Sequence, residues 1–360
     1  MSDFEQRRNE ILEVIIEAYV STASPVSSEL ISRRLRQALS PATIRNVMAE
    51  LEEEGLLEQP HTSAGRVPTD SGYRYYVDSL MEVMRLPLEE SQRLSQMVRP
   101  EELELDSFFA CVSEALSSLS HQVAFVVAPT VKHSTIKQIE LLPIGLRKLL
   151  CVLVGQEALV SSHVVDVEEP ISRDEAISLA HFLNTELVGL PTQELLASLE
   201  RRVLAVSDSF YHLIKRAHAI LQSVLATEPE ERLFLGGMLH LFEQPEFRKD
   251  PRKAHGLLRQ FEQQTALLER LRTDLVCLLP ASGRASMASG GTRVRIGREV
   301  QLEGLDECSY ILTPFRVRHI IVGGVGVLGP KRMDYRRMRA LVEDMAVRVT
   351  EGLNQWELEG

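Results

Sequence analysis

Hydrophobic residues recur three and four positions apart through the first eighty residues, which is the spacing of helices with one buried face. The first such segment spans 4–20, where Ile11 and Ile15 fall on one line. A second helix is predicted to begin near Ser27 or Ser28, after a short turn that contains proline. A third segment, 40–55, shows the pattern most clearly, so three short helices are expected to open the chain.

The third helix has sequence signals at both ends. Ser40 can cap its first turn, Pro41 suits the first helical position, and Gly55 follows the last turn. Between these limits the apolar residues form one stripe that must face a core: Ile44, Val47, Met48 and Leu51. The opposite side of the helix carries small residues and two good hydrogen-bonding side chains: Ala42, Thr43, Arg45, Asn46 and Ala49.

Such a face is suited to the major groove of DNA. Asparagine matches the N6/N7 edge of adenine, arginine matches the O6/N7 edge of guanine, and alanine lets the backbone come close. The candidate DNA-reading residues are Ser40, Ala42, Thr43, Arg45 and Asn46. An ordinary amphipathic surface helix is the alternative interpretation, because short capped helices with a polar face are common in globular domains.

A small hairpin is predicted directly after this helix. Leu56 and Leu57 suggest the start of a strand, Pro60 and Gly65 supply turn chemistry, and the chain returns at Val67. The predicted tip carries residue types that contact phosphates or probe a minor groove: His61, Thr62, Ser63 and Arg66. A solvated loop is the alternative interpretation of this stretch.

A basic cluster ends the second predicted helix and adds three candidate phosphate contacts: Arg33, Arg34 and Arg36. With them, the elements follow one another as helix, turn, helix and hairpin. This order is typical of a winged helix-turn-helix DNA-binding domain.

Several stretches of the sequence also carry a family resemblance. They read PVSS at 25–28, SPATIRNVMAELEEEGLLEQPHTSAGRVPTDSGYRYYVD at 40–78, EQPEF at 243–247 and VGGVGVLGPKRMDY at 322–335. With these motifs the chain resembles the heat-inducible transcription repressor family HrcA over nearly its whole length. It departs from the usual family pattern at Ser28, where glycine is frequent, and at Lys331, where threonine is usual.

The resemblance implies a function and a set of partners. It implies a repressor that binds, as a homodimer, a double-stranded DNA operator, the inverted repeat called CIRCE, ahead of chaperone and chaperonin operons. It also implies that the chaperonin maintains the activity of the repressor, so that unfolded proteins occupying the chaperonin during heat stress leave the operons switched on. For the fold, it implies a GAF-like domain interrupted by a dimerising insertion.

The remainder of the chain predicts a mixed α+β fold with two groups of strands. The first group is 123–127, 136–142, 149–154 and 158–165, and the second is 294–296, 310–317 and 320–327. The interval between the groups is helical in pattern, and Asp334 is expected to open a terminal helix. Because neither group alone makes a comfortable sheet with a covered face, one sheet split by a helical insertion is predicted.

These elements define the expected domain organisation. The predicted limits are 1–85 for the winged helix-turn-helix domain, 105–167 for the first part of the GAF-like domain, 168–233 for the helical dimerisation insertion and 234–360 for the second part of the GAF-like domain.

Charge argues against a generic binder of polyanions. The net charge is −11, and residues 1–80 carry eight arginines against thirteen acids, a net of −5. Binding to DNA would therefore depend on where the charges lie. The arginines concentrate between Arg33 and Arg74, whereas five glutamates cluster at and beyond the end of the third helix. Affinity for random DNA is accordingly expected to be low, and specificity is expected to depend on dimerisation and base contacts.

Other classes of protein find little support in the sequence. The longest apolar runs are far too short to span a bilayer and no apolar leader opens the chain, so a cytoplasmic location with no membrane partner is expected. Four cysteines are scattered without metal-ligand spacing and are expected to be core residues. The histidines lack partners at catalytic or metal-binding spacing, so we expect no enzyme activity, cofactor or metal.

One motif suggests a nucleotide, since 324–329 matches G-x-G-x-x-G after an apolar strand. Pro330 and a last helix follow it, however, and no strand remains to complete a βαβ unit, so turns or close strand packing are the preferred explanations. A ligand-responsive regulator or small enzyme built on the GAF-like sheet, with the winged helix as a partner-docking module, is the alternative function. No residue pattern identifies a ligand for it.

Overall fold

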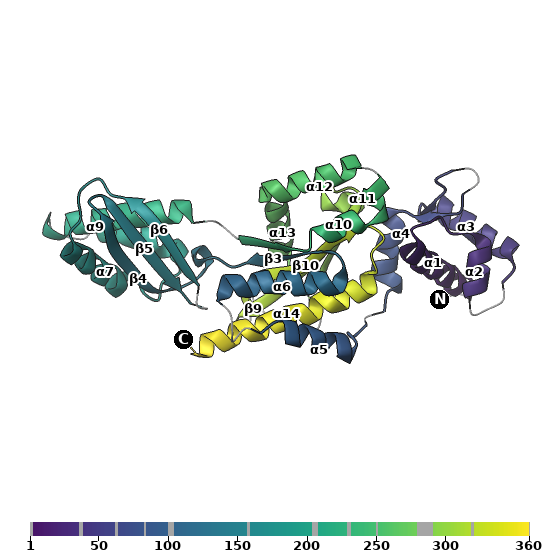
Figure 1. The fold of residues 1–360 in the computed structure, drawn as a ribbon, viewed down its shortest axis with the longest axis horizontal. Helices are drawn as coiled ribbons and strands as arrows, with labels where there is room; N and C mark the ends of the chain where they lie inside the picture. The colour runs from purple at the N-terminus through teal and green to yellow at the C-terminus, as the bar shows by residue number, and fades with distance from the viewer. Residues whose placement is uncertain are drawn as a thin grey trace.

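The computed structural model describes residues 3–35, 39–61, 64–82, 84–99, 104–156, 159–203, 208–228, 232–249, 251–278, 291–317 and 320–359. These residues form an elongated molecule with three parts along its long axis (Figure 1). We call them the head (3–82), the body (84–128 and 232–359) and the insertion lobe (129–228). The head and the insertion lobe lie at opposite ends, with the body between them.

The head contains the three helices and the hairpin that were predicted, in the predicted order, followed by one further helix and a short helical turn. They are α1 (Asp3–Thr22), α2 (Ser28–Arg34), α3 (Pro41–Glu53), the hairpin strands β1 (Leu57–Glu58) and β2 (Val67–Pro68), α4 (Asp70–Tyr75) and the short π-helical turn η1 (Tyr76–Leu80). Side-chain oxygens of Ser27, Ser40 and Thr69 accept backbone N–H groups at the starts of α2, α3 and α4. The predicted bounds of the third helix are therefore confirmed.

The core of the head is made by the apolar stripes of its helices. The stripe of α3 is buried against α1 and α2, and the buried residues of those helices include Ile11, Ile15 and Ile31. The backbone of Val26 pairs with Arg66 in both directions at 2.9 Å, which ties the turn before α2 to the base of the hairpin. The head is thus one packed unit, and α3 is held firmly within it.

The body is a five-stranded antiparallel sheet between two layers of helices. Its order is β7–β3–β10–β9–β8, with β3 at Val123–Ala128, β7 at Arg232–Gly236, β8 at Arg293–Ile296, β9 at Cys308–Val317 and β10 at Ile320–Pro330. One face is covered by α6 (Leu105–Ser120) and α14 (Tyr335–Glu359), with α5 (Leu88–Met97) outside them. The other face is covered by α10 (Leu239–Glu243), α11 (Pro245–Lys249), α12 (Pro251–Gln263) and α13 (Thr265–Cys277).

Two sequence predictions for the body are confirmed. Asp334 opens the terminal helix, since its Oδ1 accepts the Arg337 backbone N–H at 3.1 Å. The glycine-rich run lies inside β10, between β3 and β9, where a Cβ on Gly326 would come within 2.2 Å of the Ile311 carbonyl oxygen. These glycines permit close strand packing, as expected, and the run is not the loop of a dinucleotide site.

The prediction of a single split sheet is wrong in one respect. The strands β4 (Ile136–Gly145), β5 (Lys148–Gly155) and β6 (Val160–Asp166) do not join the body sheet but form their own antiparallel sheet, β4–β5–β6. Their buried side chains pack on α7 (Arg173–Leu187), α8 (Leu195–Val203) and α9 (Asp208–Thr227). Short 3-10 turns, η3 (Val131–His133) and η4 (Thr192–Glu194), complete the insertion lobe.

The reason lies in the burial pattern of the strands. All six residues of β3 are buried, so this strand needs cover on both faces, whereas β5 alternates between buried and partly exposed positions. A sheet that buries one face can close its own core with the helices that follow it in sequence. The predicted limit at residue 168 therefore falls within a single packed lobe rather than at its boundary.

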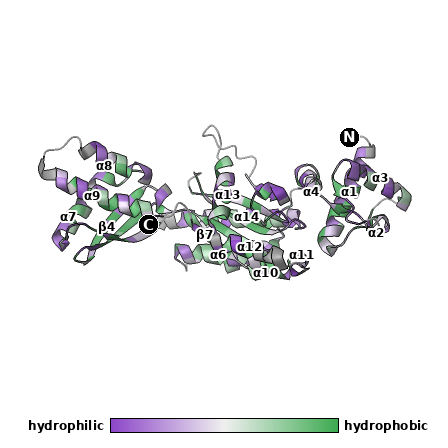
Figure 2. Cartoon of the chain, turned by 90° about the horizontal axis from the view of Figure 1, so that it is seen from above, coloured by the Kyte–Doolittle hydropathy of each residue, from purple (hydrophilic) through white to green (hydrophobic). Residues whose placement is uncertain are grey.

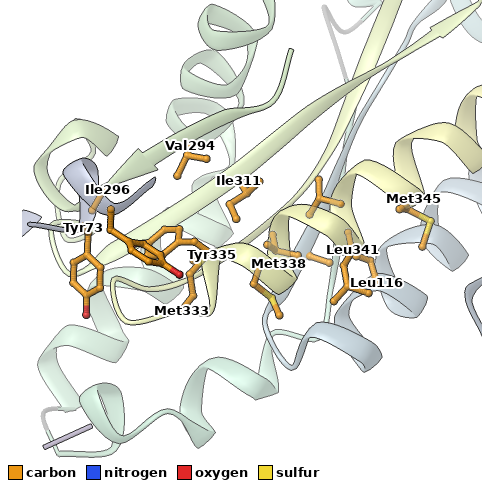
Figure 3. Packing of buried hydrophobic residues seen from close by; sticks show 14 of the residues in the cluster. Tyr73, Leu116, Val294, Ile296, Ile311, Met333, Tyr335, Met338, Leu341 and Met345 are labelled. Atoms are coloured by element: carbon orange, nitrogen blue, oxygen red, sulfur yellow. The ribbon is translucent and has the colours of Figure 1, made fainter. Parts of the chain in front are cut away.

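Head and body share one continuous hydrophobic core. At the joint between them, the rings of Tyr73 in α4 and Tyr335 in α14 pack with centroids 5.7 Å apart, beside Met333 (Figure 3). From there the core continues along α14 through Met338 and Leu341. The hydroxyl of Tyr73 is buried without a hydrogen-bond partner among the described residues, and burial raises the pKa of this group well above its usual range.

This hydroxyl leads to a stability prediction. We expect Tyr73→Phe to leave the protein as stable or to raise its free energy of unfolding by about 1 kcal/mol, because it removes a desolvated polar group and keeps the ring contact. Urea unfolding followed by circular dichroism measures the change. Tyr335→Phe is the matched control and should destabilise, since the Tyr335 hydroxyl donates to the Lys331 carbonyl at 2.6 Å and lies 2.8 Å from Ser309 Oγ. Destabilisation by Tyr73→Phe of the same size would contradict this reasoning.

A buried ionic cluster lies between α13 and the body sheet. The Asp274 carboxylate is 0% exposed and accepts hydrogen bonds from Arg295 Nε at 2.9 Å, from a second Arg295 nitrogen and from the Tyr310 hydroxyl. Burial opposes ionisation of Asp274, but the hydrogen bonds from Arg295 and Tyr310 outweigh it and lower the pKa of the carboxyl. The cluster therefore holds a charged carboxylate inside the body.

The cysteines are only partly as expected. In the described part of the chain all four thiols are free, and Cys151 and Cys308 are buried core residues. Burial raises the pKa of the Cys151 thiol to about 12. Cys277, however, is exposed at the end of α13 rather than in the core.

Among the described helices, none is both long enough and apolar enough to cross a membrane.

Candidate nucleic-acid interface

The outer face of α3 presents the residues that were predicted to read DNA. Ala42, Thr43, Arg45 and Asn46 are all exposed, while the apolar stripe on the other side of the helix is buried. Ser40 is exposed as well, but its Oγ accepts the Thr43 backbone N–H at 3.1 Å and lies 2.9 Å from Thr43 Oγ1. Ser40 thus acts first as the helix cap, and it positions the Thr43 hydroxyl at the start of the exposed face.

Arg45 is directed along the start of the neighbouring helix. Its Nε donates to Ser28 Oγ at 3.2 Å, and its Nη2 lies 3.9 Å from Glu29. Both charged side chains are well exposed, Arg45 at 63% and Glu29 at 70%, so water screens this ion pair and it contributes little. The guanidinium is therefore oriented by Ser28 yet accessible to another acceptor.

The hairpin beside α3 is short, with Leu57 opposite Pro68 and Glu58 opposite Val67. His61 is exposed on the connecting loop, and its carbonyl accepts the Ala64 N–H at 2.8 Å. Thr62 and Ser63, which were predicted to contact DNA, lie outside the described residues, as does Arg36. Arg33 and Arg34 are exposed in the last turn of α2.

Arg66 differs from its predicted placement. It was expected at the tip of the hairpin, but it directly precedes β2 at the hairpin base, and its side chain is only 19% exposed. Its Nη2 lies 2.7 Å from Glu52 near the end of α3. The backbone bridge to Val26 fixes this position, so the guanidinium braces α3 against the hairpin. A phosphate contact by Arg66 would have to replace this ion pair.

Ion pairs explain how an acidic head can present a DNA-compatible face. Glu54 pairs with Arg8 at 2.7 Å, Glu52 with Arg66, and Glu13 with Arg336 of the body at 2.7 Å. Asp70 pairs with Lys331 of the body at 2.9 Å. These four acids are paired with basic side chains within the protein, whereas Glu29 stays exposed beside Arg45. The net charge of the head is therefore a poor guide to the local charge at its candidate interface.

Other candidate sites are weaker. A cavity of about 980 Å³ lies between head and body, but charged side chains of both signs dominate its lining, among them Asp70, Arg74, Glu299 and Lys331. Small-molecule pockets are mostly apolar with few polar groups, so this cavity does not favour a ligand-sensing function. In the described part of the chain, no group of three or more histidine, cysteine or carboxylate side chains could hold a metal ion.

The sequence pattern missed one polar cluster, in the insertion lobe. Ser161 Oγ and the buried Glu228 carboxylate both contact His163 Nε2, and Thr227 Oγ1 lies 3.3 Å from His163 Nδ1. In a nucleophilic triad the acid and the hydroxyl bind opposite nitrogens of the ring, so this arrangement does not activate Ser161. It instead anchors the end of α9 to β6, and only the tertiary structure brings residues 161 and 228 together.

The chain is similar over almost its entire length to known transcription repressors. The family model described as HrcA protein C terminal domain matches residues 106–338. The heat-inducible transcription repressor HrcA of Symbiobacterium thermophilum is 34% identical over 351 residues, covering 96% of this chain and 98% of that protein. The HrcA of Chlorobium phaeobacteroides is 35% identical over 359 residues, covering 98% and 99%.

A solved structure shares the fold. The crystal structure of a hypothetical protein covers 99% of both chains with a TM-score of 0.58 at 21% sequence identity. The relatives carry the name of a repressor, which agrees with the exposed DNA-compatible face of α3. From the family match and these relatives together, the chain belongs to the HrcA family of heat-inducible transcription repressors.

Proposed function

We propose that this chain represses chaperone and chaperonin operons by binding, as a dimer, to the inverted-repeat operator CIRCE. In this proposal the head is a winged helix-turn-helix domain in which α3 enters the major groove and the β1–β2 hairpin is the wing. Thr43, Arg45 and Asn46 contact base edges, while Arg33 and Arg34 contact phosphates. The body is a GAF-like domain, and the insertion lobe is the dimerising unit.

The observation that carries the proposal is the exposed face of α3. Its residues are small or hydrogen-bonding, and the stripe behind them locks the helix to α1 and α2. A recognition helix needs both properties, because base contacts require side chains held at a defined distance from the backbone contacts. An ordinary surface helix does not need small residues on its exposed face.

Dimerisation is supported by the outer face of the sheet in the insertion lobe. The helices cover only one face, and the other carries an apolar row in which Leu142 is opposite Leu150 and Leu150 is opposite Val164. Val160 continues this surface, and the hydrophobic strands of the lobe are visible in Figure 2. An open apolar sheet face typically marks an interaction site. We propose a second copy of this chain as its partner, since a two-fold dimer matches an inverted repeat.

On this basis we propose new limits for the dimerising insertion. It would comprise residues 129–228, rather than the 168–233 expected from the sequence, because β4–β6 share one core with α7–α9. The GAF-like domain would then be residues 105–128 and 232–359, with all five strands of the body sheet.

Maintenance by chaperonin is supported by the topology of the body. Val127 of β3 pairs with Gly324 of β10, so the whole insertion lobe lies in sequence between two strands that pair with each other. Long-range strand pairing is slow and exposes apolar edges until it is complete. We propose that chaperonin assists this step. Quantitative refolding of the purified protein at heat-shock temperature without any chaperone would contradict this part of the proposal.

The function is tested by titrating purified protein against a fluorescent inverted-repeat operator and a scrambled duplex at fixed physiological salt. The titration is done with and without chaperonin. Tight binding to the operator alone supports a repressor, and a gain in the active fraction with chaperonin supports its role. No preference for the operator under either condition would contradict the proposal.

Single substitutions on α3 separate base contacts from phosphate contacts. We expect Asn46→Ala or Arg45→Ala to weaken operator binding by roughly 1–3 kcal/mol and to relax specificity at one base position. Arg34→Ala is the control for a phosphate contact, and it should weaken operator and random DNA alike and reduce the salt slope by about 1. An Asn46→Ala variant that loses specific and random binding equally would contradict a base-reading role for Asn46.

A further inference from the structure

The segment after the hairpin contacts the body rather than the proposed DNA surface. Asp70, Tyr73 and Arg74 lie on one side of α4, and all three contact residues of the body. This segment belongs to the sequence block that resembles a DNA-binding motif, yet α3 and the hairpin account for the proposed DNA contacts without it. We call the contacts of α4 with the body the α4 joint.

The hydrogen bonds of the α4 joint restrict the orientation of α4 relative to the body. Asp70 Oδ1 lies 2.9 Å from Lys331 Nζ, and Asp70 Oδ2 accepts the Arg298 backbone N–H at 3.1 Å. Arg74 donates two hydrogen bonds to the Glu299 carboxylate, one from Nε at 2.9 Å and one from Nη2. Its Nη2 also donates to the Val294 carbonyl at 2.8 Å. Bidentate arginine–carboxylate pairs specify geometry as well as distance.

The body leaves a space that fits the Asp70 carboxylate. Gly297 has a φ of +54°, and a Cβ at this position would lie 2.2 Å from Asp70 Oδ2. Glycine therefore serves two purposes, since it adopts the left-handed conformation and leaves room for the carboxylate to reach the next N–H. On the side of the α4 joint that faces the hydrophobic core, the ring of Tyr73 is buried against Tyr335.

A second contact holds the head from the side of α1. Arg336 Nη2 donates to Glu13 at 2.7 Å, and Arg332 Nη1 donates to the Val20 carbonyl at 3.1 Å. The ion pairs of both contacts are partly exposed, so each contributes little to stability on its own. Their number and direction instead define the angle at which the head sits on the body.

That angle matters because of where the joint lies. The head, which carries α3, and the insertion lobe, which carries the proposed pairing face, are at opposite ends of the molecule (Figure 1). The body is then a long arm between the dimer axis and each recognition helix. A small rotation at the α4 joint would move α3 relative to its half-site.

We infer that the α4 joint is a positioning element which sets the separation and relative orientation of the two recognition helices in the dimer. Asp70 and Arg74 are positioning residues in this inference, and they do not contact DNA. The inference rests on the proposed function, and it adds a specificity determinant to it: the spacing between half-sites, as distinct from their base sequence.

The test uses the full-length protein and a set of operators with identical half-sites and spacers changed by one or two base pairs. Each added base pair rotates one half-site by about 35° relative to the other, since B-DNA turns once in 10–10.5 base pairs. Wild-type protein is expected to show one sharp optimum of spacer length. Asp70→Asn and Gly297→Ala are each expected to lower affinity at that optimum about tenfold, the scale of a typical coupling between sites, and to flatten the spacer profile. Binding to an isolated half-site should be unchanged.

Gly304→Ala is the matched control for Gly297→Ala. Gly304 also has a positive φ, +82°, but a Cβ there would meet nothing closer than 3.6 Å and would not approach Asp70. This variant is expected to keep the wild-type spacer profile. The inference is overturned if Asp70→Asn and Gly297→Ala keep the sharp optimum, or if half-site binding falls as far as operator binding. Failure of the proposed function looks different, because wild-type protein itself would then show no operator preference at any spacing.

Discussion

Val164→Asp is expected to convert the proposed dimer to a monomer and to weaken binding to the full operator by about 10²- to 10⁴-fold, the range that linked binding sites gain from effective concentration. Val164 lies on the open face of the insertion lobe, in the apolar row with Leu142 and Leu150. A carboxylate there would be desolvated on pairing with a second chain. Sedimentation analysis gives the oligomeric state, and operator titration gives the affinity.

The monomer itself should tolerate this substitution. Val164 is 57% exposed, so aspartate at this position meets water in the unpaired chain. Val347→Asp is the matched control, since it changes the same residue type at 56% exposure on α14 of the body, outside the insertion lobe. A dimeric Val164→Asp variant with unchanged operator affinity would contradict the proposed pairing face. Loss of the dimer in the Val347→Asp variant would indicate a different interface.

Asp274→Asn is expected to destabilise the body by about 3 kcal/mol, the low end of the cost of breaking a buried ion pair. The amide keeps the volume of the carboxyl but leaves Arg295 without its anionic partner. We expect a cost at the low end of this range because the Arg295 side chain is 25% exposed, so it regains part of its hydration when the ion pair is lost. Urea unfolding followed by circular dichroism measures the difference between the two proteins.

The pH dependence of this difference follows from the direction of the pKa shift. The pKa of Asp274 is lower in the folded protein than in the unfolded chain, so its contribution is fully present above the unfolded value. The contribution is lost as the pH falls through the folded pKa, in the acid range. The gap in unfolding free energy between wild type and Asp274→Asn should therefore shrink on acidification.

Asp344→Asn is the control for the loss of a carboxylate with an arginine partner. Asp344 pairs with Arg348 one turn away on α14, where Ser91 Oγ of α5 also donates to it at 3.1 Å, and both side chains of the pair are partly exposed. Its loss is expected to cost about 1 kcal/mol or less. Equal destabilisation by the two substitutions, or a gap for Asp274→Asn that does not change with pH, would contradict the buried-pair explanation.

The three helices and the hairpin of the head, and the face that α3 exposes, follow from local patterns in the sequence. Ser40, Pro41 and Gly55 bound this helix through local capping and backbone preferences, which depend on neighbours within a few residues. The apolar stripe selected the buried side in the same local way. The start of the last helix at Asp334 and the close packing of the glycine-rich strand were also readable from nearby residues.

How distant segments combine became apparent only in the folded structure. The strand pattern did not show that β4–β6 would form a sheet apart from β3, because strand propensity does not specify a partner. Arg66 was predicted at the tip of the hairpin, but its side chain pairs with Glu52 and is only 19% exposed. The roles of Asp70 and Arg74 depend on Lys331 and Glu299, more than two hundred residues away in sequence. Such contacts arise from packing between parts of the chain, and no local pattern records them.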